Sequence, residues 1–162
     1  KSHDEPLPAS AWPLLREWPD IVLFEGWCVG TPPEPEERLR QPVNTLEAEE
    51  DAKGLWRRHV NHHLQTDYRQ WWSLLDGLLF LRVPGFAQVL QWRLLQETRL
   101  RDSYLARGAA VPAQVMSAAQ IHRFIHHYER LTRWNLDCLP LSADLVLDLQ
   151  EDHRFGGLRR LP

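Results

Sequence analysis

Three short apolar runs along the chain predict the strands of a sheet. They occupy residues 20–24, 77–83 and 144–149. Pro19 and Gly26 flank the first run, and Pro84 ends the second. Continuous apolar runs of this length are typical of strands buried on both faces of a parallel sheet. We therefore expect three strands that pair in parallel.

Helical periodicity fills the sequence between these runs. Asn44 or Thr45 is a suitable N-cap for a helix that reaches about Trp72, with Gly54 as a candidate interruption. Its predicted buried stripe consists of Leu55, Val60, Leu64, Tyr68 and Trp71. A second helix is predicted over 86–105. A third begins after Ser117, and its apolar stripe consists of Ile121, Phe124, Ile125, Tyr128 and Leu131.

The remaining segments predict irregular structure. Residues 1–19 contain four prolines and form a lead-in to the core at 20–149. The Pro-rich stretch 30–42 predicts a loop, and the tail 150–162 is expected to fray around its Gly-Gly pair. Strand, helix, strand, two helices and strand is the order of an α/β protein with right-handed crossovers.

Composition narrows the class of protein. The 162 residues have the length of one domain, and 43% of them are hydrophobic. A net charge of −3 argues against a dedicated nucleic-acid binder. The apolar runs are too short for a membrane span, and the first residues do not form a signal peptide. Cys28 and Cys138 are too few for a disulfide framework, which favours a reducing compartment. Taken together, these features lead us to expect a cytoplasmic protein without nucleic-acid or membrane partners.

Charge is distributed unevenly along the chain. Residues 34–51 contain seven acidic side chains against two arginines, whereas residues 93–133 contain seven arginines against three acids. An Arg-rich segment within an acidic chain predicts a local anion site, for example for phosphate. The alternative is an Arg-rich helix face that is simply solvated.

Two groups of residues are candidates for phosphate chemistry. Glu25 follows the first predicted strand, and ligands of parallel sheets bind beyond the carboxyl ends of strands. Its carboxylate could hold Mg²⁺, or it could face solvent as an ordinary strand-terminal acid. Arg93, Arg99 and Arg101 lie on the second predicted helix and could close over a phosphoryl group as a lid. Salt bridges to nearby acids are the alternative role for these arginines.

Histidines and aromatic residues supply further candidates. His59 and His63, like His122 and His126, are spaced i, i+4 and could ligate a metal, but neither pair has a third ligand fixed by sequence. The expected role for these histidines is therefore structural. Three more candidates at the presumed site end or on an anion-binding helix face are Trp27, His127 and Arg130. Cys28 has no predictable base beside it, which favours a buried structural thiol.

An ordered set of motifs resembles one kinase family. The segment 20–30, Asp-Ile-Val-Leu-Phe-Glu-Gly-Trp-Cys-Val-Gly, closely resembles the second-motif strand of D-glycerate 3-kinase-like proteins. These belong to the phosphoribulokinase and uridine kinase group of P-loop kinases. Segments 42–47, 86–97, 127–134 and 143–153 match in the same order, so that the resemblance covers nearly the whole chain.

The resemblance implies a P-loop kinase-like parallel α/β fold that phosphorylates a hydroxyl of a small acid such as D-glycerate. ATP and Mg²⁺ would be its cofactors. Glu25 would lie beside Mg²⁺ and Arg93 beside the transferring phosphoryl group, and Asp152 and His153 would lie near the adenine. Arg99 and Arg101 would belong to the lid, and Lys1 would contribute to the acceptor side. Together with Trp27, His127 and Arg130 they are the predicted substrate- or phosphate-binding residues.

One motif of the family is missing. None of the eight glycines begins a GxxxxGK(S/T) P-loop, whose backbone N–H groups cradle the phosphates. We therefore expect residues 1–162 to be the C-terminal part of a kinase domain whose P-loop segment precedes Lys1. The sheet should then have an unpaired edge, and apolar burial should be incomplete. The alternatives are a non-catalytic, kinase-like binding protein for an anionic metabolite or partner, and a kinase for another acceptor.

Overall fold

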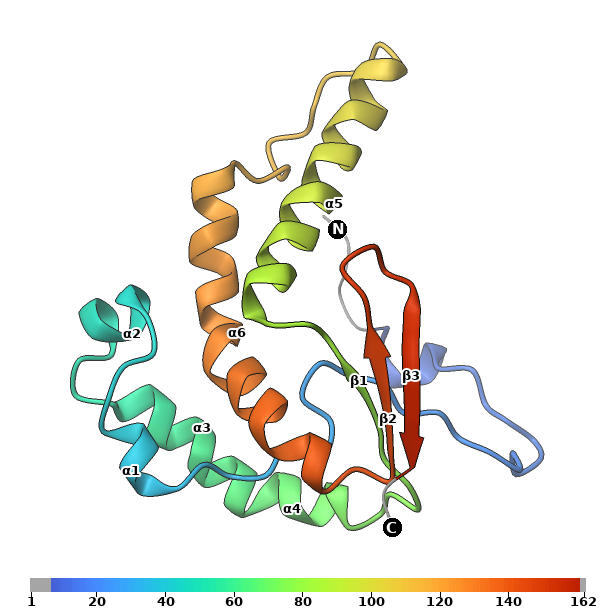
Figure 1. Cartoon of the computed structure of the whole chain (residues 1–162). Coiled ribbons are helices and arrows are strands. Elements are labelled where there is room, and N and C mark those ends of the chain that lie inside the picture. The colour runs from blue at the N-terminus through green and yellow to red at the C-terminus, as the bar shows by residue number, and fades with distance from the viewer. Residues whose placement is uncertain (1–6, 161–162) are drawn as a thin grey trace.

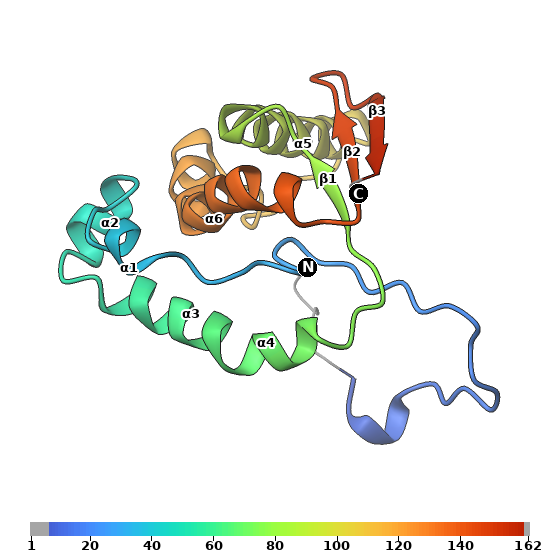
Figure 2. The same cartoon turned by 60° about the horizontal axis from the view of Figure 1, so that its bottom comes forward.

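The computed structural model describes residues 7–160 and contains a helical hairpin, a small sheet and a group of shorter helices (Figure 1). The hairpin consists of α5 and α6, which run antiparallel beside the sheet. The shorter helices lie on the far side of α6 from α5 (Figure 2). The elements in chain order are η1 (Ala9–Ala11), α1 (Glu36–Leu39), α2 (Thr45–Glu50), α3 (Leu55–Gln65), α4 (Asp67–Trp72), β1 (Leu79–Arg82), α5 (Phe86–Ala106), α6 (Ala118–Cys138), η2 (Leu139–Leu141), β2 (Leu145–Leu149) and β3 (Phe155–Arg160).

The sheet is mixed, with the strand order β1-β2-β3. β1 and β2 pair in parallel, as the two later apolar runs predict. β2 and β3 pair antiparallel, so the prediction of a frayed tail is wrong for residues up to Arg160. A tight turn makes this pairing possible, because Gln150 N–H donates to Arg154 O at 2.9 Å and His153 adopts a φ of 65°.

The predicted first strand, residues 20–24, does not form. The segment lies outside the sheet, and its side chains face solvent, with Ile21 77% and Leu23 92% exposed. Residues 77–83 do form a strand, but β1 is shorter than predicted and only half-buried. A strand needs a neighbouring backbone to satisfy its N–H and C=O groups, and in residues 7–160 no strand pairs with 20–24. An apolar run is therefore not sufficient to make residues 20–24 a strand.

One face of the sheet is rich in leucine and open. Directly paired residues share a face, and the register pairs Leu79 with Leu145, Leu81 with Leu147, and Leu147 with Leu158. Leu79 and Leu81 are each 49% exposed, whereas Val146 on the opposite face is fully buried. Within the described residues, β1 also has no partner on its outer edge. Among the described residues the β1 edge is open and the leucine face is half-exposed, and that a P-loop strand belongs beside them stays a prediction.

The predicted helix over 45–72 is three helices. Asn44 caps α2 as predicted, because its side chain accepts the Glu47 N–H. Gly54 separates α2 from α3: its φ of 69° favours glycine, and a Cβ would lie 2.7 Å from the Arg58 side chain. Thr66, with a φ of −110° and a ψ of −86°, separates α3 from α4. Of the five predicted stripe residues only Leu64 is buried, while the other four, on both sides of the break at Thr66, are exposed.

The two long helices are confirmed at their predicted positions. Ser117 begins α6 through a reciprocal capping box with Gln120, in which each side chain accepts the other residue's N–H. Ile121 and Ile125 are buried, as their stripe predicts. Phe124 remains 38% exposed, so only part of that stripe faces the core.

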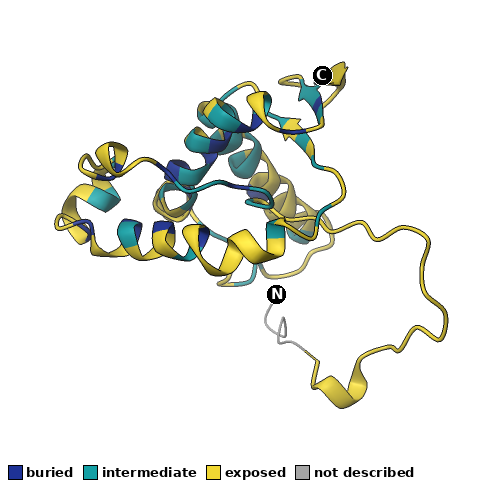
Figure 3. Cartoon of the chain, turned by 90° about the horizontal axis from the view of Figure 1, so that it is seen from below, coloured by how far each residue is buried: buried dark blue, intermediate teal, exposed yellow. Residues whose placement is uncertain are grey.

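The segment 28–42 is largely irregular, as predicted, but it is only partly exposed: Thr31, Glu34 and Leu39 are buried, whereas residues 35–38 and 40–42 face solvent. It runs between α6 and the α3–α4 pair (Figure 2). Trp134 donates its indole N–H to Pro32 O at 2.8 Å, and Trp72 donates to Thr31 O at 3.1 Å. Thr31 and Leu39 are almost completely buried, in contrast to the exposed chain that precedes residue 28 (Figure 3). This segment thus connects the two helical layers.

Candidate functional site

A cavity of about 540 Å³ lies among the short helices and α6. Its apolar wall comes from α2, α3, α4 and α6, and its polar wall contains four acids, two arginines and two histidines. Three candidates that lie far apart in the sequence meet here, namely Trp27, His127 and Arg130. The other lining residues are Cys28, Glu34, Leu46, Glu47, Glu50, Asp51, Trp56, Arg57, Val60, Asn61, Leu64, Tyr68, His126 and Leu131.

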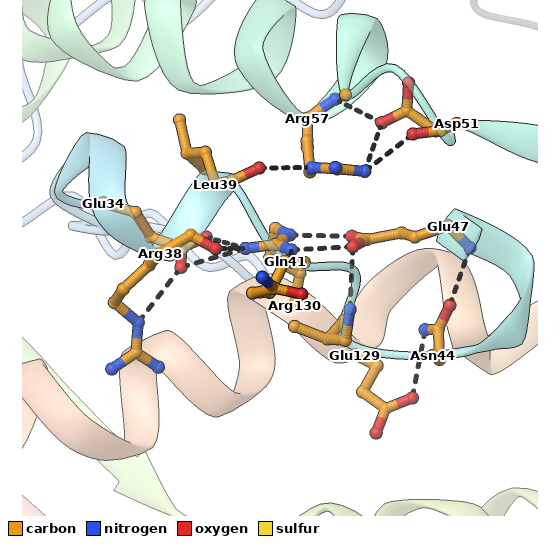
Figure 4. Close-up of polar contacts among 12 residues, drawn as sticks. Glu34, Arg38, Leu39, Gln41, Asn44, Glu47, Asp51, Arg57, Glu129 and Arg130 are labelled. Carbon is orange, nitrogen blue, oxygen red and sulfur yellow. Dashed lines mark hydrogen bonds and ion pairs between the residues drawn. The ribbon is translucent and has the colours of Figure 1, made fainter.

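Arg130 is the centre of a buried ion network (Figure 4). Its Nε and Nη2 each donate to a Glu47 carboxylate oxygen at 2.7 Å, and its Nη1 donates to Glu34 at 3.2 and 3.3 Å. Further bonds reach the carbonyl oxygens of Arg38 and Gln41 at 3.2 and 2.6 Å. Burial opposes the charge, but the carboxylates outweigh it and raise the pKa of Arg130. Its guanidinium is thus used to hold the segment 34–47 against α6.

A second buried arginine holds the start of α3. Arg57 donates from Nε to Leu39 O at 2.6 Å, and from Nη1 to Asp51 O at 2.7 Å and to Asp51 Oδ2 at 3.3 Å. Asp51 in turn accepts the backbone N–H groups of Trp56 and Arg57 at 2.9 and 3.1 Å. Burial opposes ionisation of Asp51, but these donors and the Arg57 charge outweigh it and lower its pKa. The cavity therefore keeps both of its arginines paired with protein acceptors.

Trp27 and His127 remain accessible in the cavity wall. Trp27 donates its indole N–H to Thr132 Oγ1 at 2.9 Å and packs edge-on against Tyr128, with ring centroids 4.8 Å apart. His127 lies on the exposed face of α6, near Glu50. A hydrogen bond from Arg123 lowers the pKa of Glu50, and the charge of His127 adds to this effect. Trp27 and His127 are the predicted residues here that a bound molecule can reach.

A second hollow, of about 450 Å³, brings together the other group of candidates. Arg93 and Arg99 of α5 line it with His153 from the β2–β3 turn. The His153 ring stacks on Trp92, with centroids 4.4 Å apart and planes at 26°. The turn is also fixed by the Trp92 indole, which donates to Glu151 O at 2.8 Å. This hollow combines a planar aromatic surface with arginine side chains.

Arg93 is paired within α5. Its Nη1 lies 2.5 Å from the Glu97 carboxylate. Burial opposes ionisation of Glu97, but the backbone N–H of Met116, which donates to Glu97 at 2.7 Å, and Arg93 lower its pKa. Arg101 contacts the same connection, since it donates to Met116 O at 3.4 Å. Arg93 and Arg101 therefore help to fix the α5–α6 loop, and this agrees with the salt-bridging alternative for Arg93.

The other predicted residues lie elsewhere. Glu25 is exposed on the irregular segment before residue 28, and Asp152 forms an ion pair with Arg154 in the β2–β3 turn. Lys1 lies outside the described residues. The roles predicted for these three residues stay predictions.

Glu25 alone does not fit a magnesium site. Mg²⁺ takes near-octahedral oxygen ligands, several of them water, together with carboxylates and substrate phosphates. Among residues 7–160, no three or more His, Cys, Asp or Glu side chains are grouped so that they could hold a metal ion. The exposed Glu25 carboxylate would be one ligand at most, and we derive no chemical step through the metal.

The cysteines do not favour nucleophilic chemistry. Burial raises the pKa of the Cys28 thiol, and it raises that of Cys138 to about 11. A thiol whose pKa is raised carries little thiolate, the reactive form. Cys28 lines the main cavity and is half-buried rather than buried as predicted, while its raised pKa disfavours a nucleophilic role.

Sequence reasoning missed the acids that pair with the two buried arginines, namely Glu34 and Glu47 with Arg130, and Asp51 with Arg57. Glu34, Glu47 and Asp51 are visible in the sequence only as part of an acidic run. Asn61 also belongs to the network, because its side chain accepts Glu34 N–H at 2.6 Å and donates to Glu34 O at 3.0 Å. The signal in the sequence was the run of seven acids at 34–51, which equals in number the seven arginines at 93–133.

Comparison with known proteins indicates a distant kinase relative. The chain is 25% identical over 152 residues to the chloroplastic D-glycerate 3-kinase of Arabidopsis thaliana. The aligned region covers 89% of this chain but 29% of that protein, so the chain spans less than a third of its relative's length. No family model matches the chain, and no solved structure matches it significantly. The partly parallel α/β architecture is compatible with a kinase-like fold.

The described helices do not include one that is long and apolar enough to cross a membrane. α5 and α6 have sufficient length, with 21 residues each, but both contain many charged side chains.

We expect stability to fall in acid because of Asp51 and Glu97. The folded state lowers both pKa values, so their contribution is complete above the unfolded values and is lost as pH falls through the folded ones. The free energy of unfolding, measured in urea, should therefore decrease from about pH 5 towards pH 3. The variant Glu97→Gln should show a shallower decrease over this range. Equal stability of the unmodified chain at pH 5 and pH 3 would contradict the assignment.

Proposed function

We propose that this chain is part of an ATP-dependent kinase that phosphorylates a hydroxyl group of a small acid such as D-glycerate. The observation that carries the proposal is the similarity to a protein named D-glycerate 3-kinase across 89% of this chain. The parallel pairing of β1 with β2 and the crossover through α5 and α6 are in keeping with such an enzyme. The proposed compartment is the cytoplasm.

The nucleotide would require a P-loop segment that the printed sequence does not contain. The relative is more than three times as long as the region aligned with this chain. The open β1 edge, the leucine face beside it and the exposed residues 21–24 support pairing with a further segment. ATP and Mg²⁺ would be bound jointly by that segment and this chain, with Glu25 as one metal ligand.

We assign different roles to the main cavity and to the hollow lined by Arg93, Arg99 and His153. Around this hollow, Arg93, Arg99 and Arg101 would lie on the phosphate side, and Asp152 and His153 on the adenine side. The stacked Trp92–His153 pair supports this, because a planar base can stack on it. Trp27 and His127, in the wall of the main cavity, would contact the acceptor.

Phosphoryl transfer depends on positioning and charge stabilisation rather than on covalent chemistry by the protein. The guanidinium of Arg93 could stabilise negative charge on the transferring group, provided that it exchanges Glu97 for the phosphoryl oxygens. Arg130 would act through the fold, since its donors already bind Glu34 and Glu47. Arg93 on α5 would thus contact the phosphoryl group, while Arg130 on α6 would hold the fold around the main cavity.

The test uses the complete protein that contains this chain. We expect ATP-dependent phosphorylation of at least one member of a panel of small hydroxy acids and nucleosides, measured by ADP release and mass of the product. The Glu25→Gln variant should lose at least about tenfold in turnover, because the charge of a metal-facing carboxylate is removed. Glu17→Gln, in the same exposed segment, is the matched control. Unchanged turnover in Glu25→Gln would remove Glu25 from the site, and failure with the whole panel would overturn the kinase proposal.

A non-catalytic binding protein is the second candidate, and the pairing of Arg93 and Arg130 with protein carboxylates favours it. The sequence upstream of Lys1 discriminates between the two. A GxxxxGK(S/T) motif there, together with ATP binding, supports the enzyme. A complete protein that lacks the motif and does not bind ATP supports the binding module.

A further inference from the structure

Two histidines on α3 are in direct contact. His59 and His63 are one helical turn apart, and their ring centroids lie 4.5 Å apart with planes at 77°. Side chains at i and i+4 share a helix face, so both imidazoles point to the same side of α3. His126, from the other i, i+4 pair, instead lines the main cavity. The rings of the α3 pair are close enough to share a ligand.

A carboxylate orients one of these imidazoles. Asp67 Oδ2 lies 2.6 Å from Nδ1 of His63. With Asp67 ionised, this bond places the proton of a neutral His63 on Nδ1 and leaves the Nε2 lone pair free. Metal-binding histidines commonly donate their second N–H to a carboxylate in this manner. The break at Thr66 lies between the two residues, and the 2.6 Å contact forms across it.

The pair is accessible from outside. A hollow of about 570 Å³ lies over the two imidazoles, and its wall is completed by Val60, Asp67, Tyr68 and Trp71. His59 is exposed, and the side chain of His63 is 38% exposed. Asp67 is the charged group of this lining and is negative. A hydrated cation can therefore approach without crossing the protein core.

We infer that His59 and His63 form a binding site for a late first-row divalent cation such as Cu²⁺, Ni²⁺ or Zn²⁺, with Asp67 as the positioning residue. Imidazole nitrogen suits these ions, whereas Mg²⁺ takes oxygen ligands. Within residues 7–160, no third His, Cys, Asp or Glu completes the set. The remaining coordination positions thus belong to water or to an external ligand. This site is independent of the proposed kinase activity.

Isothermal titration of the untagged chain with Cu²⁺, Ni²⁺ and Zn²⁺ tests the site. The titrations use a His3→Gln background, because His3 is another imidazole and lies outside the described residues. We expect one site per chain, affinity in the order Cu²⁺ over Ni²⁺ and Zn²⁺, and no binding of Mg²⁺. His59→Gln and His63→Gln should each weaken binding at least about tenfold, and Asp67→Asn about tenfold. His122→Gln is the matched control and should bind as the parent does.

Electron paramagnetic resonance of the Cu²⁺ complex distinguishes ligation from a structural effect. The parent should show coupling to two imidazole nitrogens, and either histidine variant should show fewer. Circular dichroism establishes that each variant keeps its helix content. Parent-like affinity in His59→Gln or His63→Gln, or an equal loss in His122→Gln, overturns the site. Parent-like affinity in Asp67→Asn overturns the positioning role.

Discussion

Replacing Arg130 with methionine should lower the free energy of unfolding by about 3–5 kcal/mol. Arg130 is buried and forms ion pairs with Glu34 at 3.2 Å and Glu47 at 2.7 Å. Methionine fills similar space but cannot donate hydrogen bonds. The carboxylates of Glu34 and Glu47 would remain in a poorly solvated environment without their main partner. Leaving buried charges unpaired in this way costs more stability than replacing the whole ion pair with apolar side chains. Urea unfolding of the chain measures the loss.

Arg123→Met is the matched control. Arg123 also pairs with an acid from the opposite charge run, Glu50, but both side chains are more than half exposed. Exposed ion pairs contribute about 0–1 kcal/mol, so this variant should be nearly as stable as the parent. In the Arg130→Met background, Glu47→Gln should recover part of the loss, because it removes one of the unpaired charges. Equal stability of the two methionine variants would contradict the buried network.

Replacing Leu39 with alanine should lower the free energy of unfolding by about 2–5 kcal/mol. Leu39 is only 1% exposed and lies at the end of α1, where its carbonyl oxygen accepts a bond from Arg57. Alanine would leave a cavity beside Leu39, and the elements packed around it could close that cavity only in part. Leu14→Ala is the matched control, because Leu14 is 90% exposed. Its effect should stay within about 0.5 kcal/mol, as for most surface substitutions.

The Leu39 result also tests the packing of residues 28–42, of which the sequence predicts 30–42 to be a loop. Its prolines correctly exclude long helices and strands, but they do not determine whether the segment is exposed. Burial follows from contacts with residues about 40 and 100 positions later, since Trp72 and Trp134 donate to Thr31 O and Pro32 O. An unfolding free energy unchanged by Leu39→Ala would contradict this packing.

Local signals predicted the two long helices and the start of α2 well, and the strands only in part. Ser117 and Asn44 act at helix ends through bonds to residues three positions away, so the sequence contains the whole interaction. Gly54 similarly ends a helical pattern through its own backbone conformation. Strands depend on distant partners: residues 144–149 have β1 and β3 beside them, whereas in the described part of the chain residues 20–24 have none. Similar apolar runs can therefore adopt different structures.

The two charge runs show most clearly what the sequence by itself determined. It determined that acids gather in 34–51 and arginines in 93–133, and it correctly located the α5 and α6 helices that carry the arginines. Only the tertiary structure decided that Arg130 meets Glu34 and Glu47, and that Trp27 and His127 reach one cavity while Arg93 and His153 reach another. The physical reason is that a buried charge must find a partner of opposite sign, and which partner it finds depends on how distant helices pack.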